Sequence, residues 1–116
     1  MNRVVLFELG SQDPEGATKF YANVFDWKIG NPNWDYWPVA TGAGESPGID
    51  GGIARSPESV AQRVQVTIQV ASIDETMAKA VENGAKADTE KMDFGGFYLA
   101  YLFDPQGIRI GLIEYK

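Results

Sequence analysis

The sequence predicts an α+β fold made of two similar halves. Two strand-like runs, VVLFEL at residues 4–9 and VQVTIQV at residues 64–70, each precede an amphipathic helical segment. Each helical segment is followed by about three short strand-like runs, separated by turns rich in glycine and proline. The repeated order of strand, helix and strands predicts two mixed sheets, each covered by one helix, with a cleft between their uncovered faces.

A helix-start signal at Asp13-Pro14 indicates the first helix. Asp13 precedes Pro14, and an acidic N-cap followed by proline at the first helical position is typical of a helix start. After the helix, residues 35–41 (DYWPVAT) form a strand near a sheet edge, because Pro38 has no N–H to donate, and GGIAR at 51–55 forms another. Apolar residues at helical spacing predict the buried stripe of this helix: Ala17, Phe20, Tyr21, Val24 and Phe25.

The second half repeats this pattern after a surface connection at residues 54–63. Ser72 and Glu75 form a capping box, and Asn83-Gly84 ends the helix. The stripe of this helix comprises Ile73, Met77, Ala80 and Val81. The remaining strands are FYLAYLF at 97–103 and IRIGLIEY at 108–115, joined by the turn DPQG.

Length and composition favour one soluble domain with repeat halves at about 1–56 and 62–116. The chain has 116 residues and a net charge of −6, so we expect no nucleic-acid partner. It has no apolar run of about 18 residues and no signal peptide, so we expect a cytoplasmic protein without membrane association. It has neither cysteine nor histidine, so acid–base chemistry would use Asp, Glu, Lys or Tyr.

Strand alternation indicates which side chains face the cleft. Phe7 and its alternate neighbours pack on the helix, which places Glu8 on the opposite side. In the second half the apolar residues Val66, Ile68 and Val70 form the core. We therefore expect these cleft-facing, ligand-binding residues: Glu8, Gln65, Thr67, Gln69 and Arg109, with Tyr36, Trp37 and Phe97 as aromatic contacts.

Each candidate also has a structural explanation. Glu8 and Arg109 can form an ion pair with each other, because buried charges normally need partners. Gln65, Thr67 and Gln69 can be the water-exposed face of a sheet. Each aromatic residue can pack in the core. The polar residues are nevertheless of interest as a set, because polar groups that converge in an apolar cleft orient small ligands.

Three segments carry a resemblance to a known superfamily. They are the opening DP-x-x-A-x-x-FY-x-x-VF-x-W at residues 13–27, PGIDGGIAR at 47–55 and the late turn and strand YLFDPQGIRIGLIE at 101–114. The chain resembles the vicinal oxygen chelate superfamily, which includes glyoxalases, bleomycin-resistance proteins and extradiol dioxygenases. The resemblance implies paired βαβββ modules that form a curved mixed sheet around a U-shaped pocket, and a homodimer.

The same resemblance implies that the family's metal site is missing. Its ligand positions correspond to Leu6, Gln65, Gly111 and, by repeat symmetry, about Gly52. Leucine and glycine side chains cannot coordinate a metal, and one glutamine amide is a weak ligand. We therefore expect no metal and no cofactor, and neither metal-dependent glyoxalase nor dioxygenase activity.

Three functions are compatible with these residues. The first is a metal-free protein that binds a small organic molecule, as in the bleomycin-resistance branch, whose acidic dimers sequester drugs in aromatic-lined grooves. The second is an enzyme of the lyase or isomerase type that uses Glu8 as a catalytic general base, since a carboxylate in an apolar pocket has a raised pKa. The third is a non-catalytic interaction module. The sequence leaves open which molecule is bound and whether it is turned over.

Overall fold

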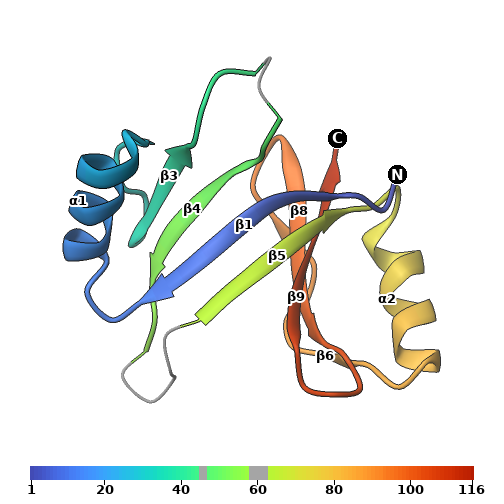
Figure 1. Ribbon diagram of the computed structural model, residues 1–116. Helices are drawn as coiled ribbons and strands as arrows, with labels where there is room; N and C mark the ends of the chain where they lie inside the picture. Colours follow the sequence, from blue (N-terminus) through green and yellow to red (C-terminus); the bar gives the residue numbers. More distant parts are fainter. Residues whose placement is uncertain (45–46, 58–62) are drawn as a thin grey trace. The chain divides into compact units, whose positions relative to one another are not determined.

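The protein contains two compact units that share one plan of strands and a helix. The computed structural model describes residues 1–44, 47–57 and 63–116, so the predicted connection at 54–63 lies partly outside them. The N-terminal unit comprises Leu6–Val64, and the C-terminal unit comprises Met1–Val5 with Gln65–Lys116. Figure 1 shows α1 along one side of the strands of the first unit and α2 along one side of the strands of the second. The α+β class and the mixed sheet with two helices are confirmed.

The predicted elements are present with small shifts at their ends. In the first unit they are β1 (Val4–Ser11), α1 (Pro14–Phe25), β2 (Lys28–Ile29), β3 (Tyr36–Ala40) and β4 (Asp50–Arg55). The second unit holds β5 (Arg63–Gln69), α2 (Ile73–Glu82), β6 (Lys86–Ala87), β7 (Met92–Asp93), β8 (Phe97–Phe103) and β9 (Arg109–Tyr115). The first two residues of β1, Val4 and Val5, belong to the C-terminal unit. The first two residues of β5, Arg63 and Val64, belong to the N-terminal unit.

The two units have the same strand order. It is β2-β3-β4-β1 in the N-terminal unit and β6-β8-β9-β5 in the C-terminal unit, where β7 also pairs with β8. In each unit the first and last strands are parallel and the other pairs are antiparallel. Glu8 pairs with Gly52, and Thr67 pairs with Gly111, so one offset of 59 positions (67 − 8 and 111 − 52) relates both partners. The repeat is therefore present in the strand register as well as in the order of elements.

Both helices begin as predicted, and their caps obey the same offset. The Asp13 carboxylate accepts a hydrogen bond from the Gly16 N–H at 3.1 Å. Ser72, 59 positions later, accepts one from the Glu75 N–H at 3.1 Å. These bonds satisfy N–H groups that have no partner inside the helix.

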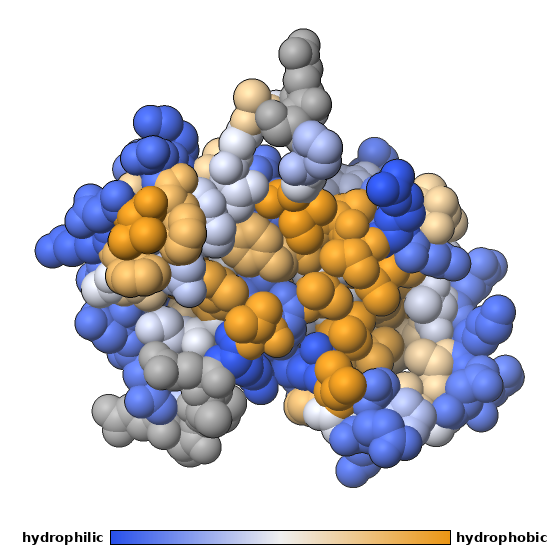
Figure 2. Space-filling view, in the orientation of Figure 1, coloured by the Kyte–Doolittle hydropathy of each residue, from blue (hydrophilic) through white to orange (hydrophobic). Residues whose placement is uncertain are grey.

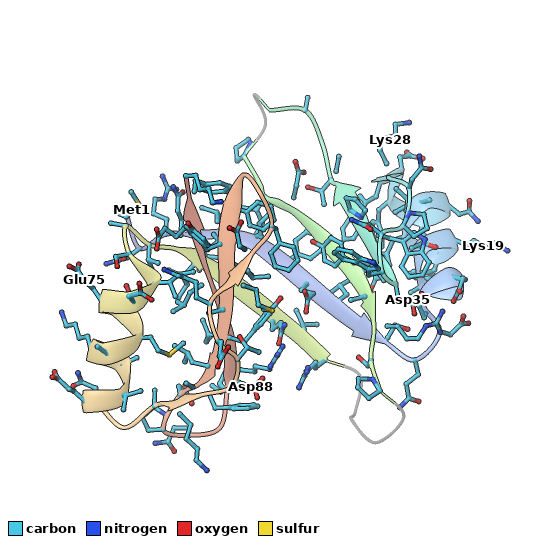
Figure 3. The ribbon with its side chains drawn as sticks, turned by 180° about the vertical axis from the view of Figure 1, so that it is seen from behind. Met1, Lys19, Lys28, Asp35, Glu75 and Asp88 are labelled. Carbon is cyan, nitrogen blue, oxygen red and sulfur yellow. The ribbon has the colours of Figure 1, made fainter. Side chains whose placement is uncertain are left out.

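Glu114 and Arg55 are related by the same offset of 59 positions, but they differ in charge, and the first residue of each helix explains why. Glu114 accepts a hydrogen bond from the Ile73 N–H at 2.7 Å, which adds a carboxylate at the positive end of the α2 dipole. Its counterpart in the first unit is Arg55. There the first helical residue is Pro14, which has no N–H, and Arg55 instead pairs with Glu15 at 2.7 Å and Asp35 at 3.1 Å. Figure 3 labels Asp35 beside the start of α1.

The predicted apolar stripe of α1 is wrong over half its length. Phe20, Val24 and Phe25 are 54%, 56% and 55% exposed, and Figure 2 shows hydrophobic side chains on the surface at this helix. The helix instead buries Pro14 and Thr18. The aromatic rings pack on one another, with Phe20 5.1 Å from Tyr21 between ring centroids.

The stripe of α2 is mostly confirmed. Ile73 is buried, and Met77 and Ala80 pack against the core of this unit. Val81 was assigned to the stripe wrongly, since it is 50% exposed. Ile73, Met77 and Ala80 follow one line along the helix, and Val81 lies at the edge of that arc. Neither helix, within the described part of the chain, is long and apolar enough to cross a membrane.

Candidate functional site

Each sheet has one face against its helix and one opposite face, which we call the open face. In the N-terminal unit the Phe7 ring lies 5.5 Å from that of Trp27, which stacks at 4.8 Å on Tyr21 of α1. Phe7 is therefore on the helix face. Alternation along β1 then places Glu8 on the open face, where it is half-buried.

Two consecutive glycines of β4 make room for aromatic rings on opposite faces. A Cβ atom at Gly51 would come within 2.8 Å of the Phe7 ring on the helix face. A Cβ atom at Gly52 would overlap the ring and hydroxyl of Tyr36 on the open face. Any other residue at position 52 would therefore displace the Tyr36 phenol.

Glu8 and Tyr36 are neighbours on this open face. Glu8 is the register partner of Gly52, and paired strands lie about 4.8 Å apart, so the carboxylate projects beside the glycine that Tyr36 covers. Burial, and then the negative charge of Glu8, raise the pKa of Tyr36 to about 12. At neutral pH the phenol therefore retains its proton.

In the C-terminal unit the helix face is the apolar core. Val70, Ala100 and Leu112 are buried there against α2. Alternation places Gln65 and Thr67 on the open face, and both are only 6% exposed. The interpretation of these two residues as a water-exposed sheet face is therefore wrong.

Gln69, from the same strand, is half-buried and belongs to the same row of side chains. Its backbone accepts a hydrogen bond from Asn2 at 2.8 Å and donates one to Arg3 at 2.9 Å. The start of the chain therefore continues the sheet of this unit beside β5.

Arg109 is held by three groups of its own unit. Its Nε donates to the Asp88 carboxylate at 2.8 Å, and its Nη1 donates to the Gln65 amide oxygen at 3.5 Å. Its guanidinium carbon lies 3.9 Å from the centre of the Tyr101 ring, a cation–π contact. The side chain is 16% exposed, so these contacts compensate a charge that is largely removed from water.

Sequence reasoning did not single out Asp88, which Figure 3 labels near the end of the sheet. Asp88 follows β6 in a connection, where strand alternation gives no orientation. The strand pairing accounts for its position, because Lys86 pairs with Phe103 and the Asp88 N–H then donates to the Tyr101 carbonyl at 2.9 Å. Arg109 lies over the ring of that same Tyr101.

Gly111 is closely covered, like its counterpart Gly52. A Cβ atom at Gly111 would lie 2.7 Å from the Thr67 hydroxyl oxygen and 3.2 Å from the Tyr101 ring. The two glycines that occupy equivalent register positions thus each lie under a tyrosine.

The three aromatic residues predicted to contact a ligand have different surroundings. Tyr36 is on the open face, whereas Trp37 pairs with the fully buried Ile53 and alternation places it on the helix face. Phe97, at the start of β8, is half-buried, and its ring lies 5.5 Å from that of Phe94 and 6.3 Å from that of Tyr115. Within the N-terminal unit, Tyr36 shares the open face with Glu8, and Trp37 does not.

Comparisons with known proteins agree on the fold. The arrangement of strands and helix that the two units share is that of glyoxalase-fold proteins. A family model described as the glyoxalase-like domain matches residues 5–113, and the chain belongs to that family. No curated protein matches it.

The similar solved structures share low sequence identity over nearly the whole chain. One is a hypothetical protein from Bacillus halodurans C-125, with 18% identity, a TM-score of 0.71, and 99% of this chain and 95% of that chain covered. Another is a Streptomyces coelicolor methylmalonyl-CoA epimerase variant in complex with 2-nitronate-propionyl-CoA, with 11% identity, a TM-score of 0.70, and 99% and 98% covered. A third is a glyoxalase/bleomycin resistance protein/dioxygenase superfamily member from Vibrio splendidus 12B01, with 15% identity, a TM-score of 0.70, and 98% and 99% covered.

The residues at the positions that the resemblance assigns to metal ligands do not fit a metal ion. Leu6, Gly52 and Gly111 have no side-chain donor atom, and Gln65 offers one amide oxygen, which is a weak ligand. The space that a ligand side chain at position 52 would need is filled by the Tyr36 phenol. Within residues 1–44, 47–57 and 63–116, no group of three or more Asp, Glu, His or Cys side chains is arranged to hold a metal ion.

Proposed function

We propose that this protein binds a small organic molecule on the open face of its N-terminal unit without a metal ion. The observation that chiefly supports the proposal is the position of Tyr36 over Gly52, because it puts a phenol where the family places a metal ligand. Glu8 and Tyr36 supply the contacts on this open face, and Gln65, Thr67 and Arg109 are candidate contacts on the open face of the C-terminal unit, taken by itself. Polar groups among apolar strands are the usual means of orienting a small ligand.

A second candidate is an isomerase that uses Glu8 as general base. It is favoured by the epimerases among the similar structures and by the half-buried position of Glu8. In such a reaction Glu8 would take a proton from the carbon next to a carbonyl, and the C–H electron pair would move onto the carbonyl oxygen. A proton from water on the other side of that carbon then completes the inversion, and Glu8 releases its own proton to water, so no proton is gained or lost overall.

The experiment that tests the binding proposal is a thermal-shift screen of metabolites and drugs on protein stripped of metal with EDTA. A compound that raises the melting temperature of the wild type, and does so less in Glu8→Gln, supports the proposal. Glu82→Gln is the matched control, because Glu82 is an exposed carboxylate at the end of α2. If no compound stabilises the metal-free protein while added Ni²⁺, Zn²⁺ or Mn²⁺ does so stoichiometrically, the proposal is wrong.

The same variant separates binding from catalysis. Loss of turnover with retained binding in Glu8→Gln would make the isomerase the better account, and loss of binding with no turnover in the wild type would support sequestration.

The proposal also includes the homodimer that the resemblance implies and a cytoplasmic location. Light scattering on a sizing column tests the former.

A further inference from the structure

Gly52 determines where the side chain of Tyr36 lies. On the open face the missing Cβ of Gly52 leaves the space that the phenol ring and its hydroxyl occupy. The backbone of Tyr36 is fixed by the pairing of β3 with β4, in which Tyr36 is the register partner of Ala54. The hydroxyl is thereby held at one place on the sheet surface.

The two polar groups at this place have different hydrogen-bonding abilities. The Tyr36 hydroxyl keeps its proton well above neutral pH and can donate it. The Glu8 carboxylate accepts hydrogen bonds, and a carboxylate group can accept several at once. A donor and an acceptor therefore lie over neighbouring register positions of the open face, the donor over Gly52 and the acceptor at Glu8.

We propose that Tyr36 and Glu8 together recognise a neutral group that presents a carbonyl oxygen and an N–H side by side, of which a primary carboxamide is the simplest. The carbonyl oxygen accepts from the Tyr36 hydroxyl and the N–H donates to Glu8. This inference rests on the proposed function and names the chemical class of the molecule bound. It gives Tyr36, rather than a metal ion, the task of contacting the carbonyl oxygen.

Charge argues for a neutral group over its charged analogues. A carboxylate ligand would be repelled by Glu8 and by the net charge of −6. An ammonium ligand would pair with Glu8 but would leave the Tyr36 proton without an acceptor, which costs free energy at a half-buried site. A carboxamide satisfies both groups.

Three probes with the same ring test this choice: benzamide, benzoate and benzylamine. Each is titrated into ¹⁵N-labelled wild-type protein, and chemical-shift changes are followed at the amides of Glu8, Tyr36 and Gly52. We expect benzamide to shift these resonances at lower concentration than either charged probe. Tyr36→Phe keeps the ring over Gly52 and removes the donor, so it should weaken benzamide binding about fivefold to tenfold.

The control variant is Tyr115→Phe, which removes the hydroxyl of an exposed tyrosine in the other unit and should leave benzamide binding unchanged. Glu8→Gln provides a second test should Tyr36→Phe fold poorly, which its own spectrum reports. Glu8→Gln should weaken benzamide and improve benzoate.

Three results would overturn the inference: no benzamide-dependent shifts at these amides, equal benzamide affinity in Tyr36→Phe, or tighter binding of benzylamine than of benzamide. Its failure is distinct from that of the proposed function. If benzamide fails while a compound from the thermal-shift screen binds metal-free protein, the inference is wrong and the function stands. If the screen yields no compound and added Ni²⁺, Zn²⁺ or Mn²⁺ stabilises the protein stoichiometrically, the function is wrong.

Discussion

The phenol of Tyr36 lies over the Cα atom of Gly52, so closely that a methyl group on that glycine would overlap the ring. Gly52 is also the register partner of Glu8. This relationship ties one glycine, one tyrosine and one carboxylate into a single arrangement on the open face of the N-terminal unit. Several consequences of it can be measured.

Gly52→Ala should destabilise the protein, because the new methyl group must displace the Tyr36 ring from a packed position. We expect a loss of about 1–3 kcal/mol in the free energy of unfolding, measured by urea denaturation. Gly44→Ala is the matched control, since a Cβ atom there meets nothing within 4 Å. Equal stability of the two variants would show that Tyr36 does not occupy this place.

The stability of the protein should decline as the pH rises from about 10 to about 12. In this range the unfolded chain loses the Tyr36 proton at its ordinary pKa of about 10, while the folded protein retains it up to about 12. The unfolded state then binds fewer protons than the native state, so the free energy of unfolding falls with pH, and this contribution is fully present below pH 10. The free energy of unfolding, measured from pH 9 to 11.5, should fall less steeply with pH in Tyr36→Phe than in the wild type.

Glu8→Gln should lower the pKa of Tyr36 while leaving it above its ordinary value. Burial is the larger cause of the raised pKa and is unchanged by the substitution, whereas the smaller contribution from the Glu8 charge is removed. The titration is followed by the ¹³Cζ resonance of labelled tyrosine. An unchanged titration would mean that the two groups do not interact.

Glu114→Ala should weaken the start of α2. The variant loses a hydrogen bond from the Ile73 N–H to a carboxylate and leaves that N–H unsatisfied at a partly buried site. We expect a cost of about 1–2 kcal/mol, and a smaller one for Glu114→Gln, which retains an acceptor oxygen. Glu82→Ala, at the exposed far end of the same helix, should change stability by less than about 0.5 kcal/mol.

Arg109→Lys should cost more than the same substitution at Arg55. A lysine at 109 cannot bond Asp88 and Gln65 and lie flat on Tyr101 at once, so we expect a loss of about 1–2 kcal/mol. The Arg55 side chain is 39% exposed, and its ion pairs are surface pairs, which contribute little to stability because solvent screens them. Thermal unfolding of both variants checks the order, and a larger effect at Arg55 would contradict this view of the Arg109 cluster.

Local patterns in the sequence were sufficient for much of the fold. Period-two alternation placed Phe7 and Glu8 on opposite faces, and the Asp13 and Ser72 caps located both helix starts. These features depend on neighbours along the chain. The α1 stripe failed because aromatic residues such as Phe20 and Phe25 pack on each other at the surface, and hydrophobic spacing alone does not reveal this.

The candidate site was predicted less completely, because its key contacts are between strands. Glu8 and Tyr36 were both selected, but their juxtaposition depends on Gly52, whose role requires the register of β1, β3 and β4. Asp88 was missed because it lies in a connection. The cleft between the two halves stays a prediction.

The most direct measurement of the central claim is the affinity of the strongest compound from the thermal-shift screen, determined by NMR titration with and without EDTA. The account predicts the same dissociation constant in both conditions, with the largest shifts at the amides of Glu8, Tyr36 and Gly52. Binding that EDTA abolishes and Zn²⁺ or Ni²⁺ restores would contradict it.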